Sequence, residues 1–232
     1  MIGEEPHVAY NRVGLTEFFQ HRKVEDLYLN PKEWYDTFGD GQLTHRINTK
    51  VTKILPHERA VETSEGTTIP YDILVLATGS DAVIPKQTPG HDANGVFVYR
   101  TISDLERLID FAAKHKGSTG VTVGGGLLGL EAAKAMTDLQ DFGKVTLVDR
   151  NRWVLARQLD EDAGNLVTEK IRQIGLDVMH QKRVLRIDVD AGNNVEGITF
   201  EDGEMLDCSC ICFAVSIVLS LPLAYHTLRY LN

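Results

Sequence analysis

Residues 121–133 read Val-Thr-Val-Gly-Gly-Gly-Leu-Leu-Gly-Leu-Glu-Ala-Ala, an apolar strand followed by a glycine turn and the start of a helix. Gly124, Gly126 and Gly129 fit the spacing G-x-G-x-x-G. Gly124 permits a tight turn, Gly126 lets a phosphate approach the backbone, and Gly129 lets the helix pack closely on the strand. The helix N-terminus adds unpaired N–H groups and a positive dipole end. The stretch therefore predicts a site for the pyrophosphate of a dinucleotide.

An acidic residue follows the next predicted strand at the distance this interpretation requires. Residues 145–148, Val-Thr-Leu-Val, form the predicted strand, and Asp149 comes about 20 residues after Gly129. Its carboxylate is expected to accept hydrogen bonds from the adenosine ribose. Arg150 and Arg152 follow, and an arginine there either pairs with the 2′-phosphate of NADP or is solvated surface. We therefore predict NAD(P)H as coenzyme, without choosing between its two forms, and favour this over a purely structural glycine turn.

The composition is that of an ordinary globular enzyme. The chain has 232 residues, of which 43% are hydrophobic and 25% charged, and a net charge of −9. This negative charge argues against nucleic acid and against anionic membranes as partners. The cysteines are Cys208, Cys210 and Cys212, whose alternation predicts thiols of one buried strand rather than a disulfide or a metal site. No secretory signal opens the chain, so we expect a cytoplasmic protein.

The hydrophobic pattern predicts an α/β fold with a parallel sheet, because strands alternate with helices in the second half of the chain. The predicted elements are strands at 50–55, 59–63 and 67–71, a strand buried on both faces at 73–76, a helix from a capping box of Ser103 and Glu106 to Gly117, strands at 121–123 and 145–148, a helix at 160–174, a strand at 176–179, and a hairpin at 188–200.

The end of the chain is apolar. Residues 208–225 carry no charge, which is near the length of a membrane span. Pro222 falls inside the run, and its first part is already explained as a buried strand. A membrane anchor is therefore the less favoured interpretation.

Two segments of the first half resemble a known family. Residues 71–80, Tyr-Asp-Ile-Leu-Val-Leu-Ala-Thr-Gly-Ser, resemble the segment that closes the FAD domain in two-dinucleotide flavoprotein reductases of the pyridine nucleotide-disulfide oxidoreductase superfamily. Residues 4–13 resemble the segment that leaves the second strand of that domain. The resemblance implies that Glu5 binds the FAD ribose and that Arg12 lies near the FAD pyrophosphate. It also implies that the backbone of Val51 meets the adenine, and that the FAD site includes Ala77, Thr78 and Gly79.

A narrower resemblance covers residues 2 to 215. Residues 9–15, 98–101, 124–133 and 157–160 together are similar to the N-terminal flavin part of assimilatory NAD(P)H nitrite reductases. This implies that electrons pass from NAD(P)H through FAD to downstream iron–sulfur and siroheme centres, for nitrite reduction in nitrate assimilation. Related ferredoxin and rubredoxin reductases usually carry a lysine where this chain has Glu17. No redox-active cysteine pair is present in the sequence, which disfavours a dithiol mechanism.

The resemblance also implies roles for the residues around the glycine turn. The cofactor-binding residues expected in the NAD(P)H domain are Gly124, Gly126, Leu127, Leu128, Gly129, Glu131, Asp149 and Arg150. Glu131 is expected close to the nicotinamide, although an acid in the first helical turn also simply suits the helix dipole. No side chain is assigned as catalytic acid or base, because the hydride passes between cofactors. No metal ligand is assigned.

The resemblance further divides the chain. It implies a partial FAD domain at 1–112, an NAD(P)H domain at 117–215 and an atypical hydrophobic tail at 216–232. The first FAD strand and its own G-x-G-x-x-G are expected before Met1, and a returning FAD segment after Val215, so the chain is expected to be truncated at both ends. Two alternatives stay open: a ferredoxin- or rubredoxin-reductase-like flavoprotein, and a dinucleotide-binding fragment without catalysis.

Overall fold

The computed structural model describes residues 1–38, 42–215 and 217–219, and the chain forms two compact units. Unit 1 contains Met1–Arg12 and Lys23–Asp81, together with the described residues after Ile217. Unit 2 contains Val13–Arg22 and Ala82–Ile217. Each unit is described separately below.

A five-stranded sheet forms the centre of unit 2. Its strands lie in the order β5 (Val96–Val98), β12 (Cys210–Phe213), β6 (Thr119–Val123), β7 (Lys144–Val148) and β8 (Asp177–Met179). All neighbouring pairs are parallel. The prediction of an α/β fold with a parallel sheet is therefore confirmed. Because the strands are parallel, their carboxyl ends share one edge, where chemistry-bearing side chains of this fold class are usually found.

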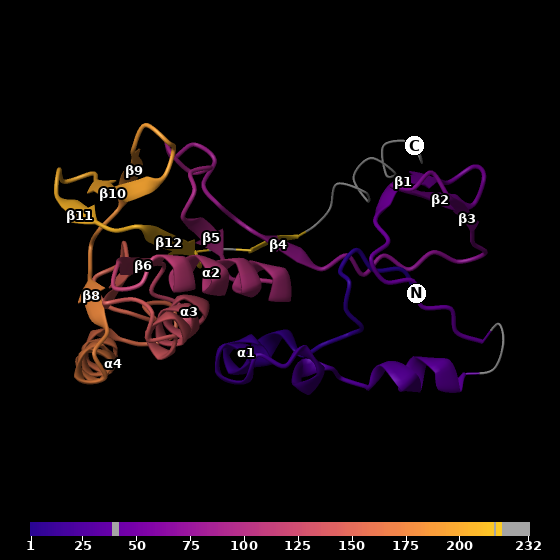
Figure 1. Cartoon of the computed structure of the whole chain (residues 1–232), viewed down its shortest axis with the longest axis horizontal. Coiled ribbons are helices and arrows are strands. Elements are labelled where there is room, and N and C mark those ends of the chain that lie inside the picture. The colour runs from indigo at the N-terminus through magenta and orange to yellow at the C-terminus, as the bar shows by residue number, and fades with distance from the viewer. Residues whose placement is uncertain (39–41, 216, 220–232) are drawn as a thin grey trace. The chain divides into compact units, whose positions relative to one another are not determined.

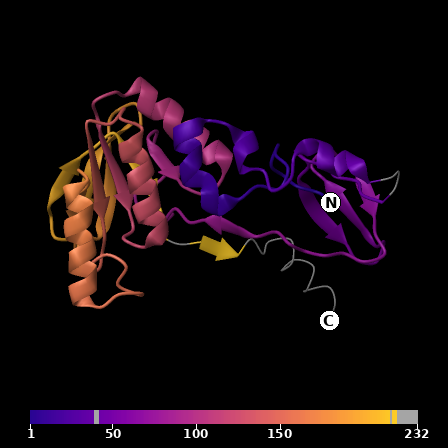
Figure 2. The ribbon, with the colours of Figure 1, turned by 90° about the horizontal axis from the view of Figure 1, so that it is seen from below.

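Helices cover one face of this sheet. Helix α3 (Leu127–Asp138) packs on β6 and β7, and α4 (Glu161–Gln173) packs on β8. Figure 2 shows these two helices side by side. Helix α2 (Ile102–Lys114) lies against β5, and the short α1 (Leu15–His21) contacts α2 and α3. The 3₁₀ turn η1 (Arg12–Gly14) leads into α1.

A second sheet covers the other face of the parallel sheet. It contains β9 (Val184–Val189), β10 (Val195–Phe200) and β11 (Met205–Asp207), which are all antiparallel. Along β6, Val121 and Val123 join the core cluster with Ile198 and Phe200 of β10, while Thr122 donates a hydrogen bond to Met136 of α3. This alternation gives unit 2 three layers, which Figure 1 shows as helices below and β9–β11 above the parallel sheet.

The predicted hairpin at 188–200 corresponds to β9 and β10, but the predicted helix start at Ser103 is two residues late. The capping box of α2 is formed by Thr101 and Asp104. The Thr101 hydroxyl accepts from the Asp104 N–H at 3.1 Å, and the Thr101 N–H donates to the Asp104 carboxylate at 2.9 Å. The earlier start places Ile102, which is fully buried, inside the helix. At α4 the Asp160 side chain caps the N-terminus, as the predicted range implies.

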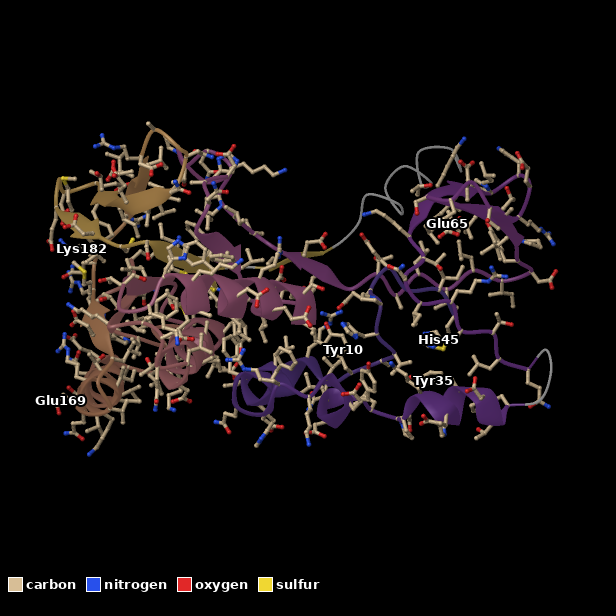
Figure 3. The ribbon with its side chains drawn as sticks, viewed as in Figure 1. Tyr10, Tyr35, His45, Glu65, Glu169 and Lys182 are labelled. Atoms are coloured by element: carbon tan, nitrogen blue, oxygen red, sulfur yellow. The ribbon has the colours of Figure 1, made fainter. Side chains whose placement is uncertain are left out.

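Unit 1 contains a small antiparallel sheet and two 3₁₀ helices. Strands β1 (Val51–Leu55), β2 (Ala60–Thr63) and β3 (Thr68–Pro70) form the predicted meander. The 3₁₀ helices are η2 (Val24–Leu27) and η3 (Lys32–Thr37). Tyr35 of η3 stacks on His45 with ring centroids 4.6 Å apart; both are labelled in Figure 3.

The predicted buried strand at 73–76 is wrong. This run has no strand geometry, and the side chains of Ile73 and Val75 are 84% and 79% exposed. A buried strand needs neighbours that pair its N–H and C=O groups and layers that cover both faces. Among residues 1–38, 42–215 and 217–219, no strand pairs with this run. An apolar run alone does not supply those partners.

The end of the chain is only partly within the described residues. Strand β4 (Ser80–Ala82) pairs with β13 (Ile217–Leu219), and the remainder of the predicted tail at 216–232 lies outside the description. Cys210 and Cys212 lie on β12 and Cys208 precedes it; all three are buried free thiols, as predicted. Within the part of the chain that the structure describes, no helix has the length and apolar character needed to cross a membrane.

Candidate functional site

The glycine turn lies at the carboxyl end of β6, at the sheet edge described above. Gly124 has a φ of +122°, a conformation that favours glycine, and a Cβ there would approach the Ala214 carbonyl oxygen to 2.7 Å. Its N–H donates to the Val148 carbonyl at 2.8 Å, which fixes the turn against β7. A Cβ on Gly129 would overlap the Gly124 carbonyl, with the carbonyl carbon at 2.8 Å. The first turn of α3 is therefore packed directly on the glycine turn.

Gly126 differs from these two glycines because nothing lies within 4 Å of the Cβ position. It is the N-cap of α3, and no side chain caps this end of the helix. Leu127 and Leu128 follow in the first turn, and Leu127 is 60% exposed. The open face at Gly126 and the uncapped N–H groups leave room for an anionic group at the helix end.

Asp149 lies beside this turn, directly after β7, and is only 4% exposed. Its carboxylate accepts hydrogen bonds from the Asn151 backbone N–H at 3.3 Å and from the Asn151 side-chain amide at 3.2 and 3.4 Å. A Cβ on Gly125 would come within 2.6 Å of the Asp149 carboxyl carbon. Arg150 and Arg152 are exposed. The sequence analysis did not identify Gly125 and Asn151; the third consecutive glycine, which G-x-G-x-x-G does not require, was the available signal.

His180 is a third residue at this edge that the sequence analysis missed. It follows β8, and its Nε2 lies 3.4 Å from the Thr168 hydroxyl. Its buried Nδ1 has no hydrogen-bond partner in the described part of the chain. Burial lowers the pKa of His180, the nearby charge of Arg172 lowers it further, and the charge of Asp149 opposes both. These effects favour the neutral imidazole next to the Asp149 loop.

Glu131 lies in the second turn of α3, not in the first turn as expected from the sequence, because the helix begins at Leu127; it is partly buried. Tyr99, which is 2% exposed, lies within electrostatic reach of it. The Tyr99 hydroxyl is 3.0 Å from the Thr16 hydroxyl of α1, and its ring stacks on Phe19. Burial raises the pKa of Tyr99, as does the charge of Glu131, so the phenol stays protonated. Glu131 therefore acts electrostatically on a neutral, buried phenol in unit 2.

Glu5 and Arg12, the residues expected near FAD, lie together in unit 1. The Arg12 guanidinium forms an ion pair with the Glu5 carboxylate. The Tyr10 hydroxyl donates to the other Glu5 oxygen at 2.6 Å and accepts from Arg12 at 2.7 Å. Tyr10, labelled in Figure 3, was not singled out from the sequence. The three side chains form a closed polar triad in which both Glu5 oxygens accept hydrogen bonds.

The other residues expected near FAD also belong to unit 1. Val51 begins β1, and Ala77, Thr78 and Gly79 are exposed residues between the 73–76 run and β4. Gly79 has a φ of +66°, which favours glycine at this position. All residues expected near FAD therefore lie in unit 1, and those expected near NAD(P)H lie in unit 2. Among the described residues, no group of three or more His, Cys, Asp or Glu is placed to hold a metal ion.

Comparison with known proteins identifies related sequences and folds. Residues 1–226 match the model of the pyridine nucleotide-disulphide oxidoreductase family. The chain is 70% identical over 217 residues to an NAD(P)H nitrite reductase of Emericella nidulans, which covers 94% of this chain and 20% of that protein. It is 36% identical over 215 residues to the NADH nitrite reductase large subunit of Escherichia coli, covering 92% of this chain and 24% of the relative. The chain thus spans about a fifth to a quarter of the length of these curated relatives.

Solved structures share the fold. An NAD-dependent persulfide reductase from A. fulgidus superposes with a TM-score of 0.85 at 23% identity, over 97% of this chain and 42% of that one. A putidaredoxin reductase, solved in covalent complex with putidaredoxin, superposes with a TM-score of 0.83 at 24% identity, over 97% and 54%.

Proposed function

The chain belongs to the pyridine nucleotide-disulphide oxidoreductase family, and from this premise we propose that it is the NAD(P)H- and FAD-binding part of a nitrite reductase. In this role it passes electrons from NAD(P)H through FAD toward iron–sulfur and siroheme centres elsewhere in the enzyme, in the cytoplasm, for nitrate assimilation. The FAD part is assigned to residues 1–112 and the NAD(P)H part to 117–215, and the tail at 216–232 belongs to neither.

The observation that carries this proposal is the edge of the parallel sheet in unit 2. Three features converge there: open space in front of Gly126, uncapped N–H groups of α3, and the buried Asp149 carboxylate at the end of the adjacent strand. A dinucleotide needs these same three features for its pyrophosphate and ribose. The residues therefore fit NAD(P)H.

The chain's own residues bind and orient the cofactors, while the cofactors supply the hydride and electron chemistry. The α3 N–H groups hold the pyrophosphate, and Asp149 accepts from the ribose hydroxyls. Arg150 is exposed next to Asp149, where its guanidinium is available to a 2′-phosphate. Glu131 is assigned to the nicotinamide end of the site.

In unit 1, the Glu5 carboxylate is assigned to the FAD ribose and Arg12 to the FAD pyrophosphate, with Val51 at the adenine and Ala77, Thr78 and Gly79 alongside. A carboxylate has about four lone-pair sites, so Glu5 retains acceptor capacity beyond its bonds to Tyr10 and Arg12. The ion pair also keeps Arg12 close to the acid with which it is assigned to bind the cofactor.

The nucleotide assignment is tested by titrating NADH into the purified chain and following nucleotide fluorescence. Asp149→Asn keeps the size of the side chain and removes its charge. We expect this variant to weaken NADH binding about tenfold, because it loses charge-assisted hydrogen bonds worth about 1.5 kcal/mol or more. Asp162→Asn, at an exposed position in α4, is the matched control. Unchanged NADH affinity in Asp149→Asn would overturn the ribose assignment.

The flavin assignment is tested by adding FAD to the same chain, removing unbound cofactor and recording the visible spectrum. A retained flavin band, together with dye reduction that depends on NADH, supports a flavoprotein oxidoreductase. NADH binding without retained flavin favours the alternative of a dinucleotide-binding fragment without catalysis. Electron delivery to a ferredoxin or rubredoxin, but not to the nitrite-reducing centres, favours the other alternative.

A further inference from the structure

The Asp149 carboxylate is restrained on two sides by residues that the dinucleotide fingerprint leaves unspecified. Gly125 lies against one side, and the amide groups of Asn151 contact the other. We propose that Gly125 and Asn151 are positioning residues that hold Asp149 toward the ribose 2′-position, and so set the discrimination between NADH and NADPH. This inference rests on the nucleotide site proposed above.

Gly125 leaves room for the carboxylate by its lack of a side chain. Any Cβ at this position would overlap the Asp149 carboxylate, and the Asp149 Cβ would lie at 2.8 Å. The Gly125 backbone has little room to move, because its carbonyl accepts a hydrogen bond from the Leu155 N–H at 2.8 Å. A larger residue at 125 would therefore displace the acid rather than the turn.

Asn151 fixes the carboxylate by hydrogen bonds. Its backbone N–H and its side-chain amide reach Oδ1, and the amide also reaches Oδ2 at 3.4 Å. These donors restrict the rotation of the carboxylate. They do not exhaust its acceptor sites, so hydroxyl groups of a ribose still find lone pairs on the two oxygens.

The backbone of this loop is held independently of the Asn151 side chain. The Asp149 N–H donates to the Met179 carbonyl at 2.9 Å, the Lys182 N–H to the Asp149 carbonyl at 3.0 Å, and the Gln181 N–H to the Asn151 carbonyl at 2.9 Å. The Lys182 side chain, labelled in Figure 3, is anchored by ion pairs with Asp202 and Glu204. Removing the Asn151 side-chain amide should therefore loosen the carboxylate, which keeps its bond to the Asn151 backbone N–H, without unfolding the loop.

The orientation of Asp149 affects the two coenzymes in opposite ways. A carboxylate at the 2′-position accepts a hydrogen bond from the hydroxyl of NADH and repels the phosphate of NADPH. Arg150 and Arg152, both exposed nearby, attract that phosphate. When the carboxylate is free to turn away, the hydroxyl contact weakens and the repulsion is relieved. The preference for NADH over NADPH should then fall.

The experiment measures the dissociation constants of NADH and NADPH for the purified chain and for Asn151→Ala. We expect the ratio of the two constants to shift toward NADPH by about three- to tenfold, the size of one or two hydrogen bonds. Asn194→Ala is the matched control, because Asn194 makes the same backbone and side-chain contacts to Asp190, at 2.8 to 3.1 Å, in the β9–β10 turn. Its ratio should not change.

A second variant approaches the acid from the other side. Gly125→Ala should shift the ratio in the same direction as Asn151→Ala, and Asn151→Ala remains informative if Gly125→Ala does not fold. An equal loss of affinity for both coenzymes, or an unchanged ratio, would overturn the positioning role. Asp149→Asn distinguishes a failure of the positioning hypothesis from a failure of the nucleotide-site assignment. If it shifts the ratio while Asn151→Ala does not, only the present inference is wrong; if it alters neither affinity, the ribose assignment fails as well.

Discussion

At the scale of single residues, alanine substitutions of Gly126 and Gly129 should distinguish an effect on coenzyme binding from an effect on stability. A methyl group on Gly129 would collide with the Gly124 backbone, which cannot rotate away, whereas a methyl group on Gly126 would enter open space. Gly129→Ala should therefore lower the free energy of unfolding by about 1–3 kcal/mol, the usual cost of overpacking. Gly126→Ala should lower it by less than about 1 kcal/mol, the scale of a helix N-cap change.

The effects on NADH affinity should be in the opposite order, with a larger loss for Gly126→Ala than for Gly129→Ala. The methyl group of Gly126→Ala would occupy the space assigned to the pyrophosphate and weaken NADH binding, whereas Gly129→Ala acts through stability. Urea unfolding and NADH titration of both variants check the pair. A stable Gly129→Ala, or a Gly126→Ala that binds NADH like the unchanged chain, would contradict the steric assignment.

Some of these residues could be predicted from sequence because their pattern is local. Gly124, Gly126 and Gly129 lie within six positions, and Asp149 is identified by the strand that precedes it. The third consecutive glycine was a local signal for Gly125, but the roles proposed for Gly125 and Asn151 depend on the position of the Asp149 side chain in the folded chain, which the sequence does not reveal. His180 required knowledge that β8 lies next to β7, which is a long-range property of the sheet.

At the scale of elements, β12 is a fully buried apolar strand between β5 and β6 in unit 2 and carries Cys210 and Cys212. Burial raises the pKa of Cys212 from 9.0 to about 12 and that of Cys208 likewise to about 12. Above pH 9 the unfolded chain loses these thiol protons while the folded chain retains them. The free energy of unfolding should therefore be intact below about pH 9 and fall as pH rises toward about 12.

Urea unfolding at two pH values, about 8 and about 10, measures this loss. Cys212→Ala should lose less stability between the two than the unchanged chain, because one of the shifted thiols is gone. Its stability at the lower pH will itself decrease, since a fully buried side chain is shortened, so the comparison concerns the difference between the pH values. Equal losses in both proteins would mean that Cys212 does not carry the effect.

The elements predicted best were those that local signals define. The α4 helix has its Asp160 cap and a terminating Gly175 with a φ of +88°, and the hairpin has its Asp190–Asn194 turn. The strand predicted at 73–76 failed because an apolar run says only that burial is favourable. It does not say whether neighbouring strands pair with it. The order β5-β12-β6-β7-β8 is likewise set by long-range pairing, since β12 inserts between two earlier strands.

At the scale of the whole molecule, the contacts of the chain divide it differently from the ranges 1–112 and 117–215, although the residues assigned to FAD lie in unit 1 and those assigned to NAD(P)H lie in unit 2. The strand β5 and the helix α2 precede residue 117 but belong to unit 2, where β5 is part of the parallel sheet and α2 packs on it. The helix α1, which precedes η2, also belongs to unit 2 and packs on α2 and α3. The family resemblance implied an FAD domain at 1–112 and an NAD(P)H domain at 117–215, whereas unit 2 takes residues from both of these ranges. The motif-based ranges follow the order of the cofactor motifs along the chain, whereas the two units are defined by contacts between residues. We expect the residues of one unit to unfold together.

This division makes a prediction about ligand-induced stabilisation. NADH binds only the folded form of unit 2, so it should stabilise that unit by about 2.7 kcal/mol at a concentration 100 times its dissociation constant. Amide hydrogen exchange in β6, β7 and β12 should slow by about 100-fold under these conditions, provided exchange occurs through unfolding of the unit. Exchange in β1, β2 and β3 should not change, because no residue of unit 1 is assigned to NADH. Asp149→Asn, compared at the same NADH concentration, should show less protection in unit 2. Equal slowing in both units would mean that they unfold together. Slowing confined to unit 1 would indicate that NADH binds unit 1 and would contradict its assignment to unit 2.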